Sequence, residues 1–211
     1  MVDAAFAAHD RIDVVVSNAG YGVFGVAEDL TDQQVDAMIA TNLTASIQLA
    51  RAVVPLLRAQ GGGRLMQMSS MGGQIAFPAF SLYHVAKWGI EGFYEALAVE
   101  VAPFGIATTL VEPGMVRTGF FDAATRVPVS PPYRGGPADR PPVPVEQLIV
   151  SQENTAALII AAADSADPPR RLVLGSDAWQ LMTDALRGRL ADVQAQRASA
   201  AEADIQPPDL G

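Results

Sequence analysis

The stretch "GRLMQMSS", residues 63–70, decides the fold. It is a short apolar run bounded by a glycine run and a serine pair, a pattern typical of a strand buried on both faces of a parallel sheet. Three further runs share this pattern: "DVVVS" at 13–17, "IATTLVEPG" at 106–114 and "RRLVLG" at 170–175. The sequence therefore predicts four parallel strands.

Longer helical segments separate these strands. The first begins at Thr31, which forms a capping-box pattern with Gln34, and its apolar residues recur every three or four positions up to a glycine run at 61–63. Further helices are predicted at about 81–101, 152–163 and 177–195. Strands that alternate with helices predict an α/β fold, with helices on both faces of a doubly wound, Rossmann-type parallel sheet.

Length and composition indicate one domain. The chain has 211 residues, 50% of them hydrophobic, which is enough to bury a single core. We expect this domain to span 1–195 and to carry a substrate lid at about 119–150, because that segment is long, rich in proline and without helical or strand periodicity. Residues 196–211 have no period and are expected to form a flexible tail.

Composition also argues against several partners. The formal net charge of −9 and the scattered basic residues argue against nucleic acid. The longest apolar runs fall short of the roughly 20 residues that cross a bilayer, and no secretory signal opens the chain, so we expect no membrane association and a cytoplasmic location. With no cysteine, and with His9 and His84 both expected to be solvated on helices, we predict no metal site.

The stretch "SNAGYGVFG", residues 17–25, contains three glycines in the spacing G-x-G-x-x-G of dinucleotide-binding loops. Such a loop should lead from a strand into a helix, and an acidic residue should end the next strand about 20 positions later. Here no strand follows until residue 63, and the acidic candidates Asp32 and Asp36 lie within a predicted helix. We therefore interpret the spacing as a coincidence of a glycine-rich turn.

The stretch "SLYHVAKWG", residues 81–89, is a better candidate for chemistry. It places Tyr83 and Lys87 four residues apart, and therefore on one face of a helix. Ser70 ends a buried strand thirteen residues before Tyr83, at the edge where α/β sheets bind their ligands. A tyrosine and a lysine at this spacing alone are typical of a solvated helix face, and a serine at a strand end is typical of hydrogen bonding to the local backbone. Their joint placement nevertheless favours a role in chemistry.

At this point the chain resembles the short-chain dehydrogenase/reductase family over residues 10–174. Five motifs occur in the family's order: "SNAG" at 17–20, "TNL" with Asn42, "MSS" with Ser70, "YHVAK" with Tyr83 and Lys87, and "VEPGMVRT" with Pro113, Gly114 and Thr118. One departure is Ser17, where the family has asparagine.

The resemblance implies an oxidoreductase that uses NAD or NADP on a small-molecule alcohol or carbonyl substrate. In this scheme Tyr83 exchanges a proton with the substrate, and Ser70 hydrogen-bonds the substrate oxygen. Lys87 binds the nicotinamide ribose, and Asn42 positions a water that links Lys87 to solvent. The implied cofactor contacts also include Asn18, Ala19 and Gly20 on the adenine side, together with Pro113, Gly114 and Thr118.

The positive charge of Lys87 is also expected to act on the ionisation of Tyr83. Bringing a tyrosine pKa of about 10 to near 7 requires about 4 kcal/mol of preferential stabilisation of the phenolate. An ammonium about 4 Å away supplies on the order of 4 kcal/mol at an effective dielectric constant of 20. We therefore expect Lys87 to lower the pKa of Tyr83.

The sequence departs most from the family's pattern at its start. The family opens with a strand, the loop T-G-x-x-x-G-x-G and two further strands, whereas Met1 falls near the helix before the family's fourth strand. We thus expect a truncated Rossmann-type sheet with "DVVV" at its edge. Two functions stay open: an oxidoreductase whose sequence begins late, or a cofactor-free half-fold that acts as a non-catalytic binding or assembly module.

The choice between NAD and NADP, the reaction direction and the substrate cannot be read from the sequence. In the family, the helices that correspond to 42–58 and 81–101 pair across a two-fold axis. We therefore expect a homodimer or homotetramer.

Overall fold

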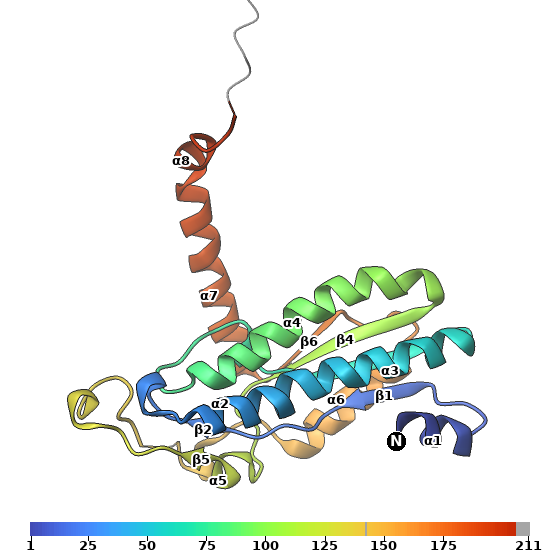
Figure 1. The fold of residues 1–211 in the computed structure, drawn as a ribbon, viewed down its shortest axis with the longest axis horizontal. Coiled ribbons are helices and arrows are strands. Elements are labelled where there is room, and N and C mark those ends of the chain that lie inside the picture. Colours follow the sequence, from blue (N-terminus) through green and yellow to red (C-terminus); the bar gives the residue numbers. More distant parts are fainter. Residues whose placement is uncertain (142, 206–211) are drawn as a thin grey trace, which may run out of the picture.

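A computed structural model describes residues 1–141 and 143–205, and its centre is a four-stranded parallel sheet in the order β1-β3-β4-β6 (Figure 1). Its strands are β1 (Val14–Ser17), β3 (Gly63–Met68), β4 (Ile106–Pro113) and β6 (Arg171–Leu174). The four predicted strands and the α/β class are confirmed. Within the described residues β1 is an outer strand of this sheet, as predicted for "DVVV".

The predicted helices are also present, with one difference in the first. Thr31 and Gln34 form the predicted capping box, but the helix that they start contains a π-helical segment, Ala40–Thr44. The α-helices are α1 (Val2–Ala8), α2 (Asp32–Ile39), α3 (Ala45–Ala59), α4 (Ser81–Val101), α5 (Phe120–Ala123), α6 (Gln152–Asp164), α7 (Ser176–Ala195) and α8 (Arg197–Ala201).

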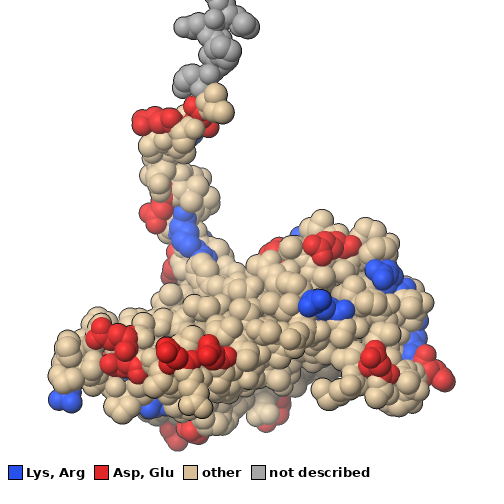
Figure 2. Space-filling view, viewed as in Figure 1, with Lys and Arg blue, Asp and Glu red and all other residues tan. Residues whose placement is uncertain are grey.

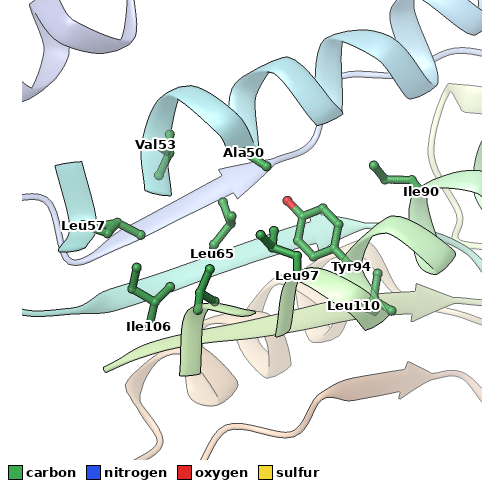
Figure 3. Packing of buried hydrophobic residues seen from close by; sticks show 10 residues of the cluster. Ala50, Val53, Leu57, Leu65, Ile90, Tyr94, Leu97, Ile106 and Leu110 are labelled. Carbon is green, nitrogen blue, oxygen red and sulfur yellow. The ribbon is translucent and has the colours of Figure 1, made fainter. Parts of the chain in front are cut away.

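Helices cover both faces of the sheet because successive residues of a strand point to opposite sides. On one side Leu65 and Leu110 pack with Ala50 of α3 and Tyr94 of α4, as Figure 3 shows. On the other side a smaller cluster joins the sheet to α6: Met66, Val111, Ala162 and Leu174. Figure 1 accordingly places α3 and α4 on one side of the strands and α6 on the other.

The end of the chain differs from the predicted tail. Helix α7 packs at its base through Ala178 and Met182 against Met71 and Ile75, and then projects away from the body of the molecule (Figure 1). Residues 197–201, expected to lack regular structure, form the exposed helix α8. Part of the predicted tail, residues 206–211, lies outside the described residues.

The segment at 119–150 has more local structure than predicted. It holds α5, two short 3₁₀ turns at 131–133 and 145–147, and the strand β5 (Thr125–Arg126), which pairs with β2 (Val23–Phe24). A parallel bridge between Val116 and Val150 joins the residues at its two ends. Opening and closing as a lid stays a prediction.

The continuous helix Asp32–Ala59 is long and apolar enough, by length and composition alone, to cross a membrane. Polar and charged residues divide its apolar positions, so it contains no long uninterrupted apolar run. The helix of a protein core passes the same test, and here Ala50, Val53 and Leu57 pack in the core cluster. This helix is therefore weak support for a membrane span.

Replacing Leu65 by alanine tests the central core. Leu65 is fully buried between the sheet and α3, so we expect Leu65→Ala to lower the free energy of unfolding by about 2–5 kcal/mol. Val85→Ala, at a position 55% exposed on α4, should change it by no more than about 0.5 kcal/mol. Urea denaturation measures both, and equal midpoints for the two variants would contradict this packing.

Candidate active site

The carboxyl ends of β1, β3 and β4 meet at one edge of the sheet, the position where open α/β sheets bind ligands. Asn18, Ala19 and Gly20 follow β1 directly and are exposed. Ser70 follows β3, and Pro113 and Gly114 end β4. The topology thus gathers most of the predicted site residues at this edge.

Helix α4 brings Tyr83 and Lys87 to the same edge. The Lys87 ammonium nitrogen lies 5.6 Å from the centre of the Tyr83 ring, and it donates a 2.8 Å hydrogen bond to the carbonyl of Met68, the last residue of β3. The Ser70 hydroxyl accepts a 3.0 Å hydrogen bond from the Gly72 amide, and it lies near enough to the Tyr83 hydroxyl to act on the pKa of that group. The structure therefore brings Ser70, Tyr83 and Lys87 together, as the sequence predicts.

The electrostatics of this group differ from the expectation. Burial raises the pKa of Tyr83 to about 12, although the Ser70 hydroxyl opposes the shift. Burial also lowers the pKa of Lys87 to about 8, and the Glu91 carboxylate acts in the other direction. Our prediction that Lys87 lowers the pKa of Tyr83 is wrong for this structure, because the loss of water dominates and the ammonium is directed toward Met68.

Asn42 has a contact that the sequence did not indicate. It is buried in the π-helical segment, a type of irregularity frequent at functional sites. Its amide donates to the Tyr21 carbonyl at 2.7 Å and its oxygen accepts from the Tyr21 amide at 3.1 Å. Asn42 therefore ties the exposed segment 18–20 to the helix. Its expected role in positioning a water toward Lys87 stays a prediction.

The loop after β4 is held by the start of α7. The Asp177 carboxylate accepts a 2.8 Å hydrogen bond from the Met115 amide, and a side chain at Gly114 would collide with this carboxylate. Thr118 accepts a 3.3 Å hydrogen bond from the Phe120 amide. The other Asp177 oxygen is buried and has no partner among the described residues. Asp177 gave no signal in the sequence because its contact spans 62 residues.

The glycine-rich turn at 17–25 has a structural explanation. A side chain at Gly22 would meet the Phe24 ring, and one at Gly25 would meet Val127, so both glycines allow β2 and β5 to approach closely. A three-residue 3₁₀ turn, Ala27–Asp29, follows the last glycine rather than a long helix. This agrees with our interpretation that the turn is not a pyrophosphate loop.

Aromatic rings surround Tyr83. The sequence did not indicate these neighbours. The ring centres of Phe24 and Phe120 lie 6.1 and 5.9 Å from that of Tyr83, and Phe80 and Phe121 pack on Phe24. These residues come from β2, α5 and the turn before α4, so no local pattern connects them. The surroundings of the predicted acid–base residue are therefore apolar.

The surface has two hollows, one beside the candidate site and one at the opposite edge of the sheet. One of about 410 Å³ adjoins Thr118 and is lined by residues that include Phe121, Arg126 and Leu148. A larger one of about 680 Å³ is lined by residues that include Arg64 and Ile106, at the amino ends of β3 and β4. We consider only the first as part of the candidate site, because parallel sheets bind ligands at their carboxyl ends.

Comparison with known proteins gives a consistent result. Residues 1–127 match the family described as short chain dehydrogenase. Oxidoreductase BOA17 of Botryotinia fuckeliana is 38% identical over 172 residues, which are 80% of this chain and 63% of that protein. The 3-ketodihydrosphingosine reductase of Bacteroides thetaiotaomicron is 37% identical over 57% of this chain and 45% of its own. The chain thus spans about half to two thirds of these curated relatives.

Solved structures show the same likeness. A short-chain dehydrogenase from Streptomyces avermitilis superposes with a TM-score of 0.85 at 34% identity, over 97% of this chain and 75% of that one. A metagenomic short-chain oxidoreductase in complex with NADP matches with a TM-score of 0.60 at 25% identity, over 82% and 64% of the two chains. An NAD⁺-bound xylitol dehydrogenase matches with a TM-score of 0.54 at 28% identity, over 57% and 46%.

His84 corrects a prediction. His9 is exposed as expected, but His84 is buried on α4. Its Nε2 accepts a 2.8 Å hydrogen bond from the Phe77 amide, and its Nδ1 lies 2.7 Å from the Gly72 carbonyl. Because Nε2 is an acceptor, the proton must be on Nδ1, where it is donated to Gly72. His84 therefore joins α4 to the loop after Ser70.

We expect His84 to titrate below pH 6.5 and to be in its neutral Nδ1–H form above that value. Burial lowers its pKa below the ordinary value of 6.5, so the stability that neutral His84 contributes is complete above that value and is lost as the pH falls through the lower pKa. Long-range ¹H–¹⁵N spectra recorded across this pH range, with His9→Gln to assign the two rings, measure tautomer and charge. A ring that titrates above pH 6.5 would contradict the assignment.

Proposed function

Because the chain belongs to the short-chain dehydrogenase family, we propose that it is the catalytic part of an NAD- or NADP-dependent oxidoreductase that acts on an alcohol or carbonyl compound. The observation that carries this proposal is the grouping of Ser70, Tyr83 and Lys87 at the carboxyl edge of the sheet. A proton donor, a neighbouring hydroxyl and a nearby cation suit the interconversion of an alcohol and a carbonyl.

The residues of this edge fit the nicotinamide half of the cofactor. Lys87 and Tyr83 would hold the ribose, and Pro113, Gly114 and Thr118 would border the nicotinamide. Asn18, Ala19 and Gly20, exposed at the end of β1, would lie toward the adenine side. Two observations support the fit. One Asp177 oxygen, next to Gly114, is buried and has no hydrogen-bond partner among the described residues, so it is free to accept a hydrogen bond from a ligand. The segment after β1 is exposed, so a ligand can reach it. When bound, the nicotinamide supplies the hydride transfer that no side chain can perform.

The proton chemistry falls to Tyr83. With a pKa of about 12 its hydroxyl keeps its proton at neutral pH, and it can give that proton to a substrate alkoxide, which is more basic than a phenolate. Ser70 would hold the substrate oxygen beside this hydroxyl. Lowering a pKa of 12 to 7 would need about 7 kcal/mol, more than the roughly 4 kcal/mol that one ammonium supplies. The site as it stands is therefore suited to protonating a carbonyl oxygen during reduction.

The phenylalanines around Tyr83 suggest a substrate class. Phe24 and Phe120 flank the tyrosine ring. An apolar substrate group that packs against these rings is removed from water, and this removal favours its binding. We propose that the part of the substrate next to the carbonyl is apolar. Comparing kcat/KM for matched ketones with and without hydroxyl groups on that part tests this proposal, and a preference for the hydroxylated ketones would contradict it.

Tyr83→Phe tests the acid–base role. We expect kcat to fall by about 10²–10⁴-fold, while the calorimetric affinities for NADH and NADPH fall far less, because the proton donor is lost but only one of several proposed cofactor contacts goes with it. Tyr94→Phe, which removes a hydroxyl from the core cluster of the same helix, is the matched control and should keep wild-type kcat. A Tyr83→Phe enzyme with wild-type kcat would rule out the assigned role. Wild-type protein that binds neither cofactor would favour the non-catalytic alternative.

We also propose that the chain forms a homodimer or homotetramer through α3 and α4. Val85, Trp88 and Val99 of α4 are 55%, 43% and 69% exposed. Figure 2 shows scattered groups of charged side chains with wide areas of uncharged surface between them. Burial of such apolar side chains between two copies would be favourable.

A charge placed on this surface should separate the copies. We expect Val99→Glu to convert the wild-type oligomer to a smaller species in multi-angle light scattering at micromolar concentration, because an unpaired carboxylate would have to be buried. Val193→Glu, equally exposed on the projecting helix α7, is the control and should leave the mass unchanged. A monomeric wild-type protein would contradict the proposed assembly.

A further inference from the structure

One face of α4 holds the loop that carries Ser70. His84, Lys87 and Glu91 lie three and four residues apart, so they project from the same side of the helix. Lys87 binds the Met68 carbonyl just before the loop, and His84 contacts the loop backbone at two points. Glu91 is the third contact, and no part of the reaction assigned above uses it.

The Glu91 carboxylate lies directly against this loop. It is 2% exposed, and its two oxygens accept hydrogen bonds from the Ser69 hydroxyl and the Gln74 amide. A side chain at Gly73 would collide with the carboxylate, so the loop backbone packs on it without an intervening group. Ser69 is the chain neighbour of Ser70, and Gln74 follows the 3₁₀ turn that Ser70 caps.

A buried carboxylate needs a partner charge, because its transfer from water is otherwise very unfavourable. Arg171 of β6 provides it, with a guanidinium nitrogen 2.8 Å from Glu91. The same guanidinium binds Glu112 of β4, which is fully buried, and Glu95, one turn along α4, at 2.6 Å.

The three carboxylates around Arg171 are not equivalent. Burial and the nearby Glu91 raise the pKa of Glu112 to about 7, and one Glu112 oxygen has no hydrogen-bond partner among the described residues. Glu91 differs from Glu112 in its hydrogen bonds: it accepts from Ser69, Gln74 and Arg171, whereas Glu112 accepts from Arg171.

We propose that Glu91 is a positioning residue: its carboxylate, held by Arg171, fixes Ser69 and Gln74 and thereby places Ser70 against Tyr83. This inference rests on the proposed oxidoreductase function for its catalytic consequence. Glu91 acts through the loop, since its own hydrogen bonds go to Ser69 and Gln74 rather than to Ser70 or Tyr83.

Glu95 provides a matched control. It lies on the same helix, pairs with the same arginine and is 45% exposed, and its recorded hydrogen bonds and ion pairs go to Arg170 and Arg171 rather than to the loop. We expect Glu91→Ala to lower kcat by about 10- to 100-fold, because a small misplacement of a reacting group is costly. Glu91→Gln, which keeps an oxygen for Ser69, should fall between Ala and wild type, and Glu95→Gln should match wild type.

A second measurement does not depend on activity. The ring nitrogens of His84 bind the backbone at both sides of Gln74, so their ¹⁵N signals report whether the loop is held. Glu91→Ala should shift or broaden these signals, and Glu95→Gln should leave them in place. If Glu91→Ala fails to fold by circular dichroism, Glu91→Gln takes its place in both measurements.

The two proposals can fail separately. An inactive wild-type protein would remove the proposed function, and the His84 signals would then decide the loop-holding role alone. If Glu91→Ala keeps both kcat and the wild-type His84 spectrum, or changes only as much as Glu95→Gln does, the positioning role is overturned.

Discussion

The contact between α4 and the end of β3 is the constraint on which the candidate site depends. The Lys87 ammonium is almost fully buried, and the Met68 carbonyl is its recorded hydrogen-bond acceptor. This bond sets the register of the helix against the strand. Successive residues of an α-helix are rotated by about 100°, so a shift of one residue would turn Tyr83 away from Ser70. The contact of this buried cation with β3 therefore determines which face of α4, and with it Tyr83, is turned toward Ser70.

Local patterns in the sequence were sufficient for the four-stranded sheet, for its longer helices and for the grouping of Ser70, Tyr83 and Lys87. Apolar runs between turn residues predict strands whatever lies elsewhere in the chain, and the capping box at Thr31 specifies its helix start through neighbours only. The spacing of Tyr83 and Lys87 fixes their common face for the same reason. Ser70 could be placed beside them because parallel strands end at one edge of the sheet.

Contacts between distant residues could not be predicted in this way. Glu91 and Arg171 are 80 positions apart, and the sequence gives no sign that β6 brings an arginine under α4. His84 looked solvated because its burial depends on how the loop after Ser70 folds back. The direction of the Lys87 side chain is a similar case: its spacing from Tyr83 is local, but its choice of Met68 as acceptor depends on the strand beside it.

The same distant contacts explain how the site can hold a lysine charge at all. Burial favours the neutral forms of both Tyr83 and Lys87, raising the pKa of one to about 12 and lowering that of the other to about 8. Glu91 opposes the second shift from one turn away, and an Arg171 guanidinium nitrogen lies 2.8 Å from the Glu91 carboxylate. The basic Arg171 of β6, the acidic Glu91 and the basic Lys87 of α4 thus follow one another toward the edge of the sheet. Because each charge is stabilised by the next, the loop geometry and the ionisation of Lys87 depend on the same carboxylate.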